Sequence, residues 1–162
     1  MEKILILSKN DSLENYLFQM LSKLNINVEN IDFKNYSNEK IKYLIIDNVG
    51  KIKFNKFYCN YCLVNMDEFK NNSLEIYGDL ITVGFGNKNT VTLSSVEENN
   101  EGFVYCIQRK IINNKNKEIQ PQEIPINKQF KNRTELYIFM YLFTIGLLEN
   151  INIEKLKDIL EK

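Results

Sequence analysis

The sequence predicts an α/β fold: an open, parallel-rich sheet with helices plus a small antiparallel β-meander. Lys3 to Leu7 is a compact apolar run, which is typical of a buried parallel strand. Apolar residues at helical spacing follow from Leu13 to Leu24, so the chain opens with a strand and an amphipathic helix. Thr90 to Val96 alternates between apolar and polar residues instead, as a strand with one solvated face does.

In the first half of the chain, one helix and three further strands are expected after the first strand. The polar turn from Ser8 to Ser12 places Asp11 or Ser12 to cap the helix. The later strands are expected at Val28–Phe33, Tyr43–Asp47 and Phe57–Met66. This order of elements predicts at least one right-handed crossover.

In the second half, extended segments are expected first and helices after them. Strands are predicted at Leu80–Gly86, Thr90–Val96 and Gly102–Ile112, and Glu118–Ile126 is expected to be an edge segment because it contains two prolines. A long helix is predicted from Arg133 or Thr134 to about Glu149, and it is apolar almost all round, which indicates burial on more than one side. A short helix from Ile153 to Leu160 follows.

The length of 162 residues predicts a single domain, because a chain of this size can bury roughly two-thirds of its unfolded surface. Within residues 1–162 we distinguish a parallel βα part (1–79), the antiparallel meander (80–126) and the C-terminal helices (127–162). The sequence shows no internal repeat and no linker between these parts.

The composition excludes several classes of mechanism and partner. Histidine is absent, which rules out a Ser-His-Asp or Cys-His nucleophile and any zinc or haem site with histidine ligands. Lysine and arginine together number 21, as do aspartate and glutamate, so bulk charge does not favour binding to nucleic acid or to a membrane surface. We therefore expect neither of these partners.

The start of the chain and its cysteines indicate a cytoplasmic protein. Met1 to Ser8 becomes polar too soon for a signal peptide, and no apolar run reaches the roughly 18 residues that span a bilayer. Cys59, Cys62 and Cys106 are too few, and odd in number, for a disulfide framework. A reducing compartment is the natural setting for such a chain.

Cys59-Asn-Tyr-Cys62 has the spacing of a redox or zinc motif. A redox pair normally lies at the N-terminus of a helix, where the helix dipole lowers the thiol pKa, whereas this pair lies in or just before a predicted strand. Regular strand geometry would place the two thiols on opposite faces of the sheet. Zinc needs four ligands, and Cys106 could supply only a third. Structural cysteines are therefore the preferred interpretation.

The turn after the first strand is where a phosphate-binding loop would lie. Such a loop exposes backbone N–H groups at glycines and adds a lysine that reaches the phosphates. Ser8-Lys-Asn-Asp-Ser12 contains Lys9 but no glycine, and Asp11 would repel phosphate. We therefore expect a plain capped turn.

Polar side chains also follow two predicted strands. Asp47 ends one strand, and Asn65, Asp67 and Glu68 end the next. Ligands of open α/β folds bind at the carboxyl ends of the strands, and the three carboxylates could hold a divalent metal there. Solvation of the strand ends explains the same residues and is the preferred interpretation, so no metal ligand and no catalytic residue is assigned.

Several short motifs occur in an order that resembles the central domain of the Mur ligases, the ATP-dependent amino-acid ligases of peptidoglycan precursor synthesis. The motifs are Leu63-Val-Asn-Met-Asp-Glu68, Leu80-Ile-Thr-Val-Gly-Phe-Gly86, Thr90-Val-Thr, Ile145-Gly-Leu147 and Ile153-Glu-Lys-Leu156. The resemblance covers about residues 60–160 and implies a Rossmann-like fold of the Mur-ligase-central-domain type. It also implies that Asn65 and Asp67 would contact the base or ribose of a nucleotide.

The chain departs from this family where the family carries out catalysis. The family's Gly-Thr-Asn-Gly-Lys-Thr/Ser loop would fall on Ser8 to Ser12, and its Gly-x-His-Asn motif would fall around Lys128 to Lys131. The family's metal-binding glutamate, its carbamylated lysine and its separate C-terminal domain have no counterpart in the sequence. Ligation needs phosphate binding and magnesium, so neither ATP nor magnesium is assigned as a cofactor.

The leading hypothesis is a non-catalytic Mur-ligase-like domain that acts as a binding or interaction module for an unidentified protein or for a second copy of itself. The very apolar helix at 136–148 suggests a homodimer. One alternative is a receiver-like or flavodoxin-like regulatory domain with Asp47 as the phosphoacceptor. Another is an ATP-dependent ligase or nucleotide-binding enzyme with a non-standard phosphate loop.

Overall fold

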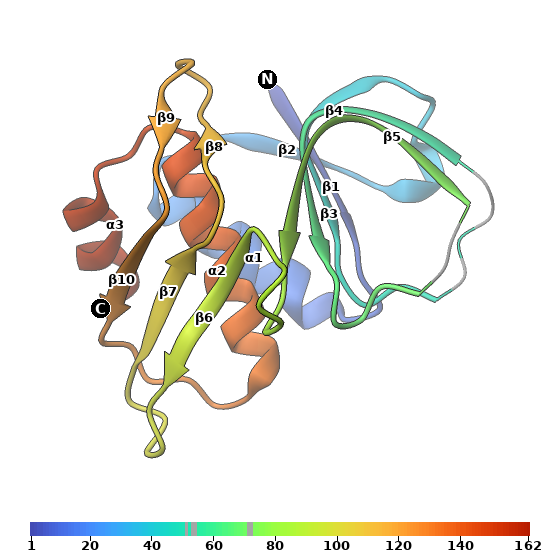
Figure 1. Cartoon of the computed structure of the whole chain (residues 1–162). Helices are drawn as coiled ribbons and strands as arrows, with labels where there is room; N and C mark the ends of the chain where they lie inside the picture. Colours follow the sequence, from blue (N-terminus) through green and yellow to red (C-terminus); the bar gives the residue numbers. More distant parts are fainter. Residues whose placement is uncertain (51, 53–54, 71–72) are drawn as a thin grey trace.

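The computed structural model describes residues 1–50, 52, 55–70 and 73–162 (Figure 1). The described part of the chain forms an eight-stranded sheet in the order β10-β7-β6-β5-β4-β3-β1-β2, together with a two-stranded hairpin and three α-helices. The elements are β1 (Glu2–Leu7), α1 (Asp11–Lys23), β2 (Val28–Ile31), the 3-10 helix η1 (Phe33–Asn35), β3 (Lys40–Ile46), β4 (Asn55–Asn65), β5 (Leu74–Val83), β6 (Val91–Val96), β7 (Phe103–Ile107), β8 (Ile111–Ile112), β9 (Glu118–Ile119), β10 (Gln122–Ile126), α2 (Arg133–Leu148) and α3 (Ile153–Leu160).

The predicted α/β fold with an open, mostly parallel sheet is confirmed. Parallel pairing joins β2, β1, β3, β4 and β5 and reaches β6 through the pair Val83–Val91. β6, β7 and β10 then pair antiparallel. The predicted meander from residue 80 is wrong in two respects, because β5 belongs to the parallel part and the antiparallel strands continue the same sheet. The separate antiparallel unit is the small β8–β9 hairpin.

The cap of α1 differs from the prediction. Asn10 is the N-cap residue, and its side-chain oxygen accepts hydrogen bonds from the backbone N–H groups of Ser12 and Leu13. Neither Asp11 nor Ser12 serves this function, because both already have helical positions in the first turn.

Two predicted strands are shorter than expected. The second strand ends at Ile31, because Asp32 caps the 3-10 helix that follows. The strand predicted from Gly102 to Ile112 is interrupted at Gln108. The Gln108 N–H donates to the carbonyl of Thr90, and its side chain donates to the carbonyl of Asn89, so the chain stays attached to β6 there before it leaves to form the hairpin.

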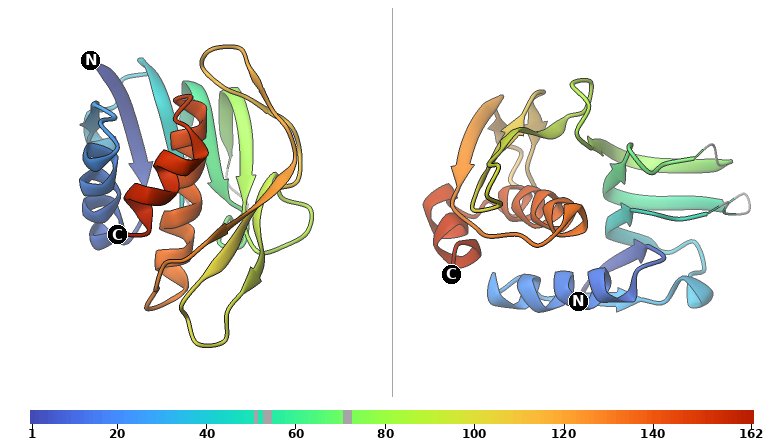
Figure 2. Two further views of the ribbon diagram at one scale, coloured as in Figure 1. Left: turned by 90° about the vertical axis from the view of Figure 1, so that its left-hand side faces the viewer. Right: turned by 90° about the horizontal axis from the view of Figure 1, so that it is seen from below.

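Helix α2 is the centre of the larger of the two apolar cores. Every residue from Leu136 to Leu148 is buried, and both the parallel and the antiparallel strands contribute side chains to this core. Figure 2 shows α2 lying inside the curve of the sheet, with α1 and α3 on either side of it. The helix that suggested a homodimer is thus covered by its own chain. Among the described helices, none is long and apolar enough to cross a membrane.

A bend in the middle of β4 and β5 shapes the other face of the sheet. Between Tyr58 and Tyr61, β4 advances three residues while β5 advances two, from Tyr77 to Asp79, which is the signature of a β-bulge. Gly78 lies opposite the bulge, where a Cβ atom would stand 2.2 Å from the carbonyl oxygen of Cys59. Figure 1 shows both strands arching over at this level.

The bend explains how parallel neighbours can be joined without a helix. Only eight residues, 47–54, connect β3 to β4, although parallel strands usually need a longer crossover. Ile46 lies level with Val64, so a straight β4 would begin roughly 30 Å from the end of β3. The nine Cα–Cα steps from Ile46 to Asn55 reach at most about 32 Å, so such a connection would be almost fully extended. Because the arms of β4 and β5 curve back, the connection does not need to be fully extended.

The bent arms also cover the second, smaller apolar core. This core contains residues of β1, β3 and β4, with Phe57 from the arm of β4 fully buried in it. Tyr36, which follows η1, stacks on Phe57 with 5.2 Å between the ring centroids. One face of the sheet is therefore covered by helices, and the other is covered largely by the sheet's own strands.

We expect Gly78→Ala to lower the free energy of unfolding by about 3 kcal/mol, because the new methyl group overlaps the backbone of Cys59. Gly86→Ala is the matched control, since a Cβ there meets its nearest atom, the Asn89 side-chain nitrogen, at 3.5 Å. The control should shift stability by no more than about 0.5 kcal/mol. Urea denaturation measures both, and equal effects would contradict the role given to Gly78.

Candidate functional site

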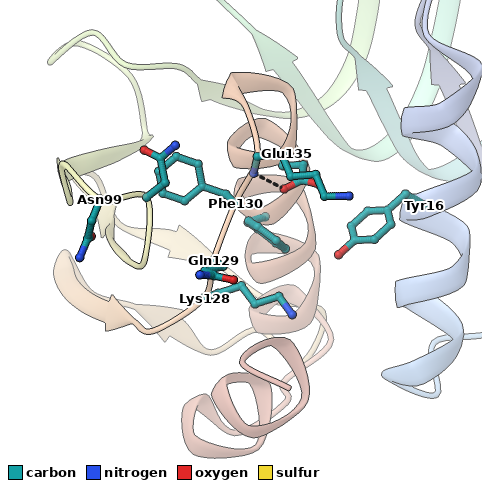
Figure 3. Close-up of a pocket in the computed structure, with 9 residues that line it drawn as sticks. Tyr16, Asn99, Lys128, Gln129, Phe130 and Glu135 are labelled. Atoms are coloured by element: carbon teal, nitrogen blue, oxygen red, sulfur yellow. Dashed lines mark hydrogen bonds between the residues drawn. The ribbon is translucent and has the colours of Figure 1, made fainter.

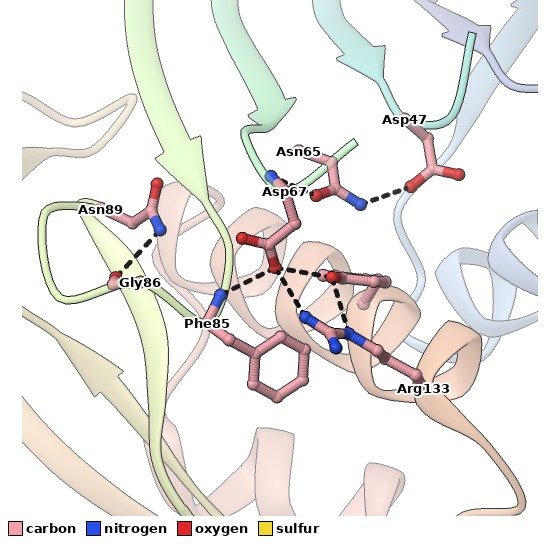
Figure 4. Close-up of polar contacts among 8 residues, drawn as sticks. Asp47, Asn65, Asp67, Phe85, Gly86, Asn89 and Arg133 are labelled. Atoms are coloured by element: carbon pink, nitrogen blue, oxygen red, sulfur yellow. Dashed lines mark hydrogen bonds and ion pairs between the residues drawn. The ribbon is translucent and has the colours of Figure 1, made fainter. Parts of the chain in front are cut away.

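The polar residues expected at the carboxyl edge of the sheet do lie together. Asp47 follows β3, Asn65 ends β4, and Ser8 follows β1. The Asn65 side-chain nitrogen donates to Oδ1 of Asp47 at 3.2 Å, and the Ser8 hydroxyl donates to Oδ2 of Asp47 at 3.1 Å. Figure 4 shows this edge with the helix α2 facing it. We call Ser8, Asp47, Asn65, Asp67, Arg133, Tyr137 and Tyr141 the edge network.

Asp47 is the most enclosed carboxylate of the edge network, with 4% of its surface exposed. The Tyr141 hydroxyl on α2 donates to Oδ1 of Asp47. Burial and the negative charge of Asp47 raise the pKa of Tyr141 well above its usual value, so this hydroxyl keeps its proton and remains a donor. Among the described residues, no lysine or arginine forms an ion pair with Asp47. Within the described residues, hydrogen bonds compensate for the burial of this carboxylate.

Asn65 uses both ends of its side-chain amide inside the protein. Its nitrogen donates to Asp47, and its oxygen accepts from the backbone N–H of Asp67 at 3.1 Å. The side chain is fully buried. Asn65 therefore fixes the turn after β4 and connects it to the end of β3.

Asp67 binds both the next turn and helix α2. Its Oδ2 accepts from the Tyr137 hydroxyl at 2.6 Å, from the Phe85 N–H at 2.9 Å and from Arg133 at 3.3 Å. Gly84 makes this close approach possible, because a Cβ there would lie 2.7 Å from Oδ1 of Asp67. The glycine in the turn after β5 is thus required by Asp67 as well as by the turn.

Arg133 and Tyr137 support Asp67 from the first turns of α2. The Arg133 guanidinium lies 4.3 Å from the ring centroid of Phe85 and donates to the Tyr137 hydroxyl at 3.0 Å. Burial and the hydrogen bond to Asp67 raise the pKa of Tyr137, while the hydrogen bond that Arg133 donates to Tyr137 raises the pKa of Arg133. Tyr137 therefore keeps its proton and Arg133 keeps its charge, as their contacts with Asp67 require.

The sequence did not predict the contribution of α2 to this site. Arg133, Tyr137 and Tyr141 follow one another at a spacing of four residues, which places them on one face of the helix. On a helix that is apolar almost all round, tyrosine side chains are expected to be buried together with the apolar ones. The spacing of three hydrogen-bonding side chains on an otherwise apolar helix is the signal that could have identified them.

The backbone N–H groups of the turn after β1 donate hydrogen bonds to acceptors within the protein. The Lys9 N–H donates to the carbonyl of Asn48 at 2.9 Å, and the Asn10 N–H donates to the Ser8 hydroxyl at 3.1 Å. Ser12 and Leu13 donate to the Asn10 side chain. This is the capped turn that was expected, with Asn10 as the cap.

The carboxylates do not gather into a metal site. Glu68 takes part in the turn through its N–H, which donates to the carbonyl of Asn65. Within the described residues, no cluster of three or more aspartate, glutamate, cysteine or histidine side chains could hold a metal ion. The oxygens of Asp47 and Asp67 bind protein donors instead.

Cys59 and Cys62 lie on the same face of the sheet, so the prediction of opposite faces is wrong. Both are buried in the smaller apolar core, because the irregularity at Asn60 shifts the alternation by one residue. Hydrogen bonding from the Cys62 thiol lowers the pKa of Cys59, and the same contact, with burial, raises the pKa of Cys62. Cys106 lies elsewhere, on β7.

An open groove of about 540 Å³ lies between α1 and the segment that leads into α2. Figure 3 shows Tyr16 of α1 on one side and the segment around Phe130 on the other. Its polar rim is partly engaged, since Glu135 accepts from the Lys131 N–H at 2.7 Å and the Lys128 ammonium donates to the carbonyl of Lys162 at 2.8 Å. The groove shares no lining residue with the edge network.

No protein-family model matches the sequence, and no curated protein matches it at a significant level. The resemblance to Mur ligases therefore rests on the short motifs alone.

We expect Tyr141→Phe to lower the free energy of unfolding by about 2 kcal/mol, because it removes a donor from the buried carboxylate of Asp47. Tyr16→Phe is the control, since the Tyr16 hydroxyl has no hydrogen bond among the described residues, and its effect should stay below about 0.5 kcal/mol. Chemical denaturation at neutral pH measures both. Equal stability of the two variants would show that Asp47 does not depend on Tyr141.

We expect Cys62→Ala to raise the pKa of Cys59, because the variant lacks the neighbouring thiol whose interaction lowers that pKa. In a Cys106→Ser background, the pH dependence of alkylation by iodoacetamide reports the thiolate of Cys59. The reciprocal variant, Cys59→Ala, should lower the pKa of Cys62. An unchanged alkylation profile in both variants would mean that the two thiols do not interact.

Proposed function

We propose that the chain is a non-catalytic, Mur-ligase-like domain that acts as a binding or interaction module. The observation that carries the proposal is that the polar groups of the edge network form hydrogen bonds with one another. Asn65 and Asp67, the two residues that the resemblance links to a nucleotide base or ribose, bind Asp47, Tyr137, Arg133 and backbone N–H groups instead. A nucleotide could reach them only by breaking these hydrogen bonds, and each buried group left without a partner costs about 1–3 kcal/mol.

The turn after β1 supports the same proposal. A phosphate at this position would need backbone N–H groups directed at it, whereas those of Lys9, Asn10, Ser12 and Leu13 donate within the protein. The turn also lacks the glycines that would let the backbone approach a phosphate closely. Phosphoryl chemistry therefore has no visible support at this edge of the sheet.

The second candidate function is a receiver-like or flavodoxin-like regulatory domain. The order β2-β1-β3-β4-β5 is that of flavodoxin-like sheets, and Asp47 lies at the end of β3, next to the point where the strand order reverses. The connection from β3 to β4 is only eight residues long, however, and carries no crossover helix among its described residues. Both carboxylate oxygens of Asp47 already accept hydrogen bonds, and the side chain is buried.

We expect isothermal titration calorimetry to detect no binding of ATP with magnesium at protein concentrations in the micromolar range. Acetyl phosphate should likewise leave Asp47 unlabelled, as intact-protein mass spectrometry would measure. Lys9→Ala and Asp47→Asn are the matched variants, and neither should differ from the unaltered chain in these two assays.

Two results would overturn the proposed function. Micromolar affinity for ATP, with turnover that is lost in Lys9→Ala, would support an enzyme with a non-standard phosphate loop. Stable phosphorylation that is absent from Asp47→Asn would support the receiver-like alternative.

A further inference from the structure

The outer side of β5 is an open strand edge. β5 pairs with β4 from Leu74 to Val83, but on its other side it pairs with β6 only at Val83. Among the described residues, the backbone from Leu74 to Ile81 therefore has no strand partner on that side. Figure 1 shows β6 turning away from β5 below this stretch. We call this stretch the β5 edge.

The β5 edge lacks two of the features that protect natural sheet edges, a short length and a lysine or proline residue, although it carries Glu75 and Asp79 and lies beside the bulge. Such edges usually carry lysine or proline, or are very short, whereas β5 has ten residues and contains neither. Tyr77 is 50% exposed and Leu80 is 56% exposed. Tyr77 stacks on Tyr58 with 5.0 Å between the ring centroids, so an exposed aromatic pair lies beside the edge.

A cavity of about 260 Å³ adjoins the β5 edge where β5 and β8 diverge. Its lining includes Tyr61, Ile81, Ile111 and Ile112, and Ile112 is 44% exposed. The Tyr61 hydroxyl donates to the carbonyl of Ile112 at 2.9 Å, which holds β8 against β4 at the back of the cavity. The cavity therefore offers a partly apolar space beside unpaired backbone.

The charge beside this cavity is negative. Asp79 lines the cavity, and its side chain forms no ion pair or hydrogen bond with the described residues. Its charge adds to burial in raising the pKa of Tyr61. The nearby Lys110 pairs with Glu118 at 3.1 Å, so it is already engaged.

We propose that the β5 edge binds an extended segment of a partner protein as an added strand, with a basic side chain beside Asp79 and an apolar side chain in the adjoining cavity. Strand addition derives affinity from backbone hydrogen bonds and specificity from alternate side chains. Asp79 and Ile81 point to the same face because they are two residues apart, so a segment with basic and apolar residues two apart matches both.

A second copy of the chain fits this edge less well than a basic segment does. Two β5 strands side by side would bring Glu75 and Asp79 of one copy toward the same residues of the other, and like charges across a strand pair are destabilising. The inference names the binding surface of the module proposed above and rests on that proposal.

The probe is a synthetic peptide of about ten residues, which is long enough to cover one strand. Threonine stands at every second position, and the positions between carry lysine and valine alternately. We expect it to bind the full chain in fluorescence anisotropy and to slow amide hydrogen exchange in β5. The same peptide with N-methyl groups on the amides of one edge should bind at least roughly tenfold more weakly, because it cannot form the backbone hydrogen bonds.

Protein variants test the negative charge of Asp79 and the exposure of the β5 edge. Asp79→Lys should weaken peptide binding at least roughly tenfold through repulsion of the lysines, and Leu80→Lys should weaken it by placing a charge on the exposed edge. Glu98→Lys changes the charge equally on the β6–β7 turn and should leave binding unchanged. Thermal melting shows whether each variant is folded.

Three outcomes would overturn the inference. The first is no binding at millimolar peptide, and the second is equal binding of the N-methylated peptide. The third is a light-scattering mass of a dimer in which the β5 amides become protected as protein concentration rises, because a second copy would then occupy the edge. Each of these outcomes leaves the nucleotide and phosphorylation tests of the proposed function unaffected, so the two failures can be told apart.

Discussion

The bend at Cys59, Asn60 and Gly78 is the constraint on which the rest of the structure depends. Without it, eight-residue connections could barely join parallel neighbours, and the smaller apolar core would lie open to water on one face of the sheet. The bend itself depends on one close approach, that of Gly78 to the backbone of Cys59. The same bend places two thiols on one face of the sheet. A local irregularity thus determines how one face of the sheet is covered.

The carboxyl edge of the sheet lies where open α/β folds bind ligands, but its polar groups bind one another and hold α2 to the sheet. Ligands of open α/β sheets usually supply the partners for polar groups at this edge. Here helix α2 supplies them, since Tyr141 donates to Asp47 and Tyr137 donates to Asp67. The hydroxyls of Tyr137 and Tyr141 therefore occupy the positions from which a ligand would otherwise donate to these two carboxylates. The edge network joins the helix at the centre of the core to the ends of β3 and β4, which is a structural contribution.

The sequence predicts most of the elements because each has a clear period. Alternation identifies β6, and a continuous apolar run identifies β1 and α2. The arm of β5 was missed because Glu75, Gly78 and Asp79 break the alternation expected of a strand. The sequence predicts the strand-end residues of the site but not their partners on α2. Asp47, Asn65 and Asp67 lie at strand ends that the hydrophobic periodicity locates. Their partners on α2 are not evident, because they lie among apolar residues of the helix. The bulge in β4 shifts the strand register, and the local sequence pattern does not reveal such a shift.

The burial of α2 has a consequence for how the chain is made. The helix begins at residue 133, yet it supplies the centre of a core to which strands from β1 to β10 contribute. During synthesis, these strands leave the ribosome before the helix on which they pack. Domains are synthesised from the N-terminus at about 5–20 residues per second, so their apolar faces stay without their main partner for several seconds. This part of the nascent chain is therefore most exposed to aggregation just before α2 emerges, which is when a chaperone would have the most apolar surface to bind.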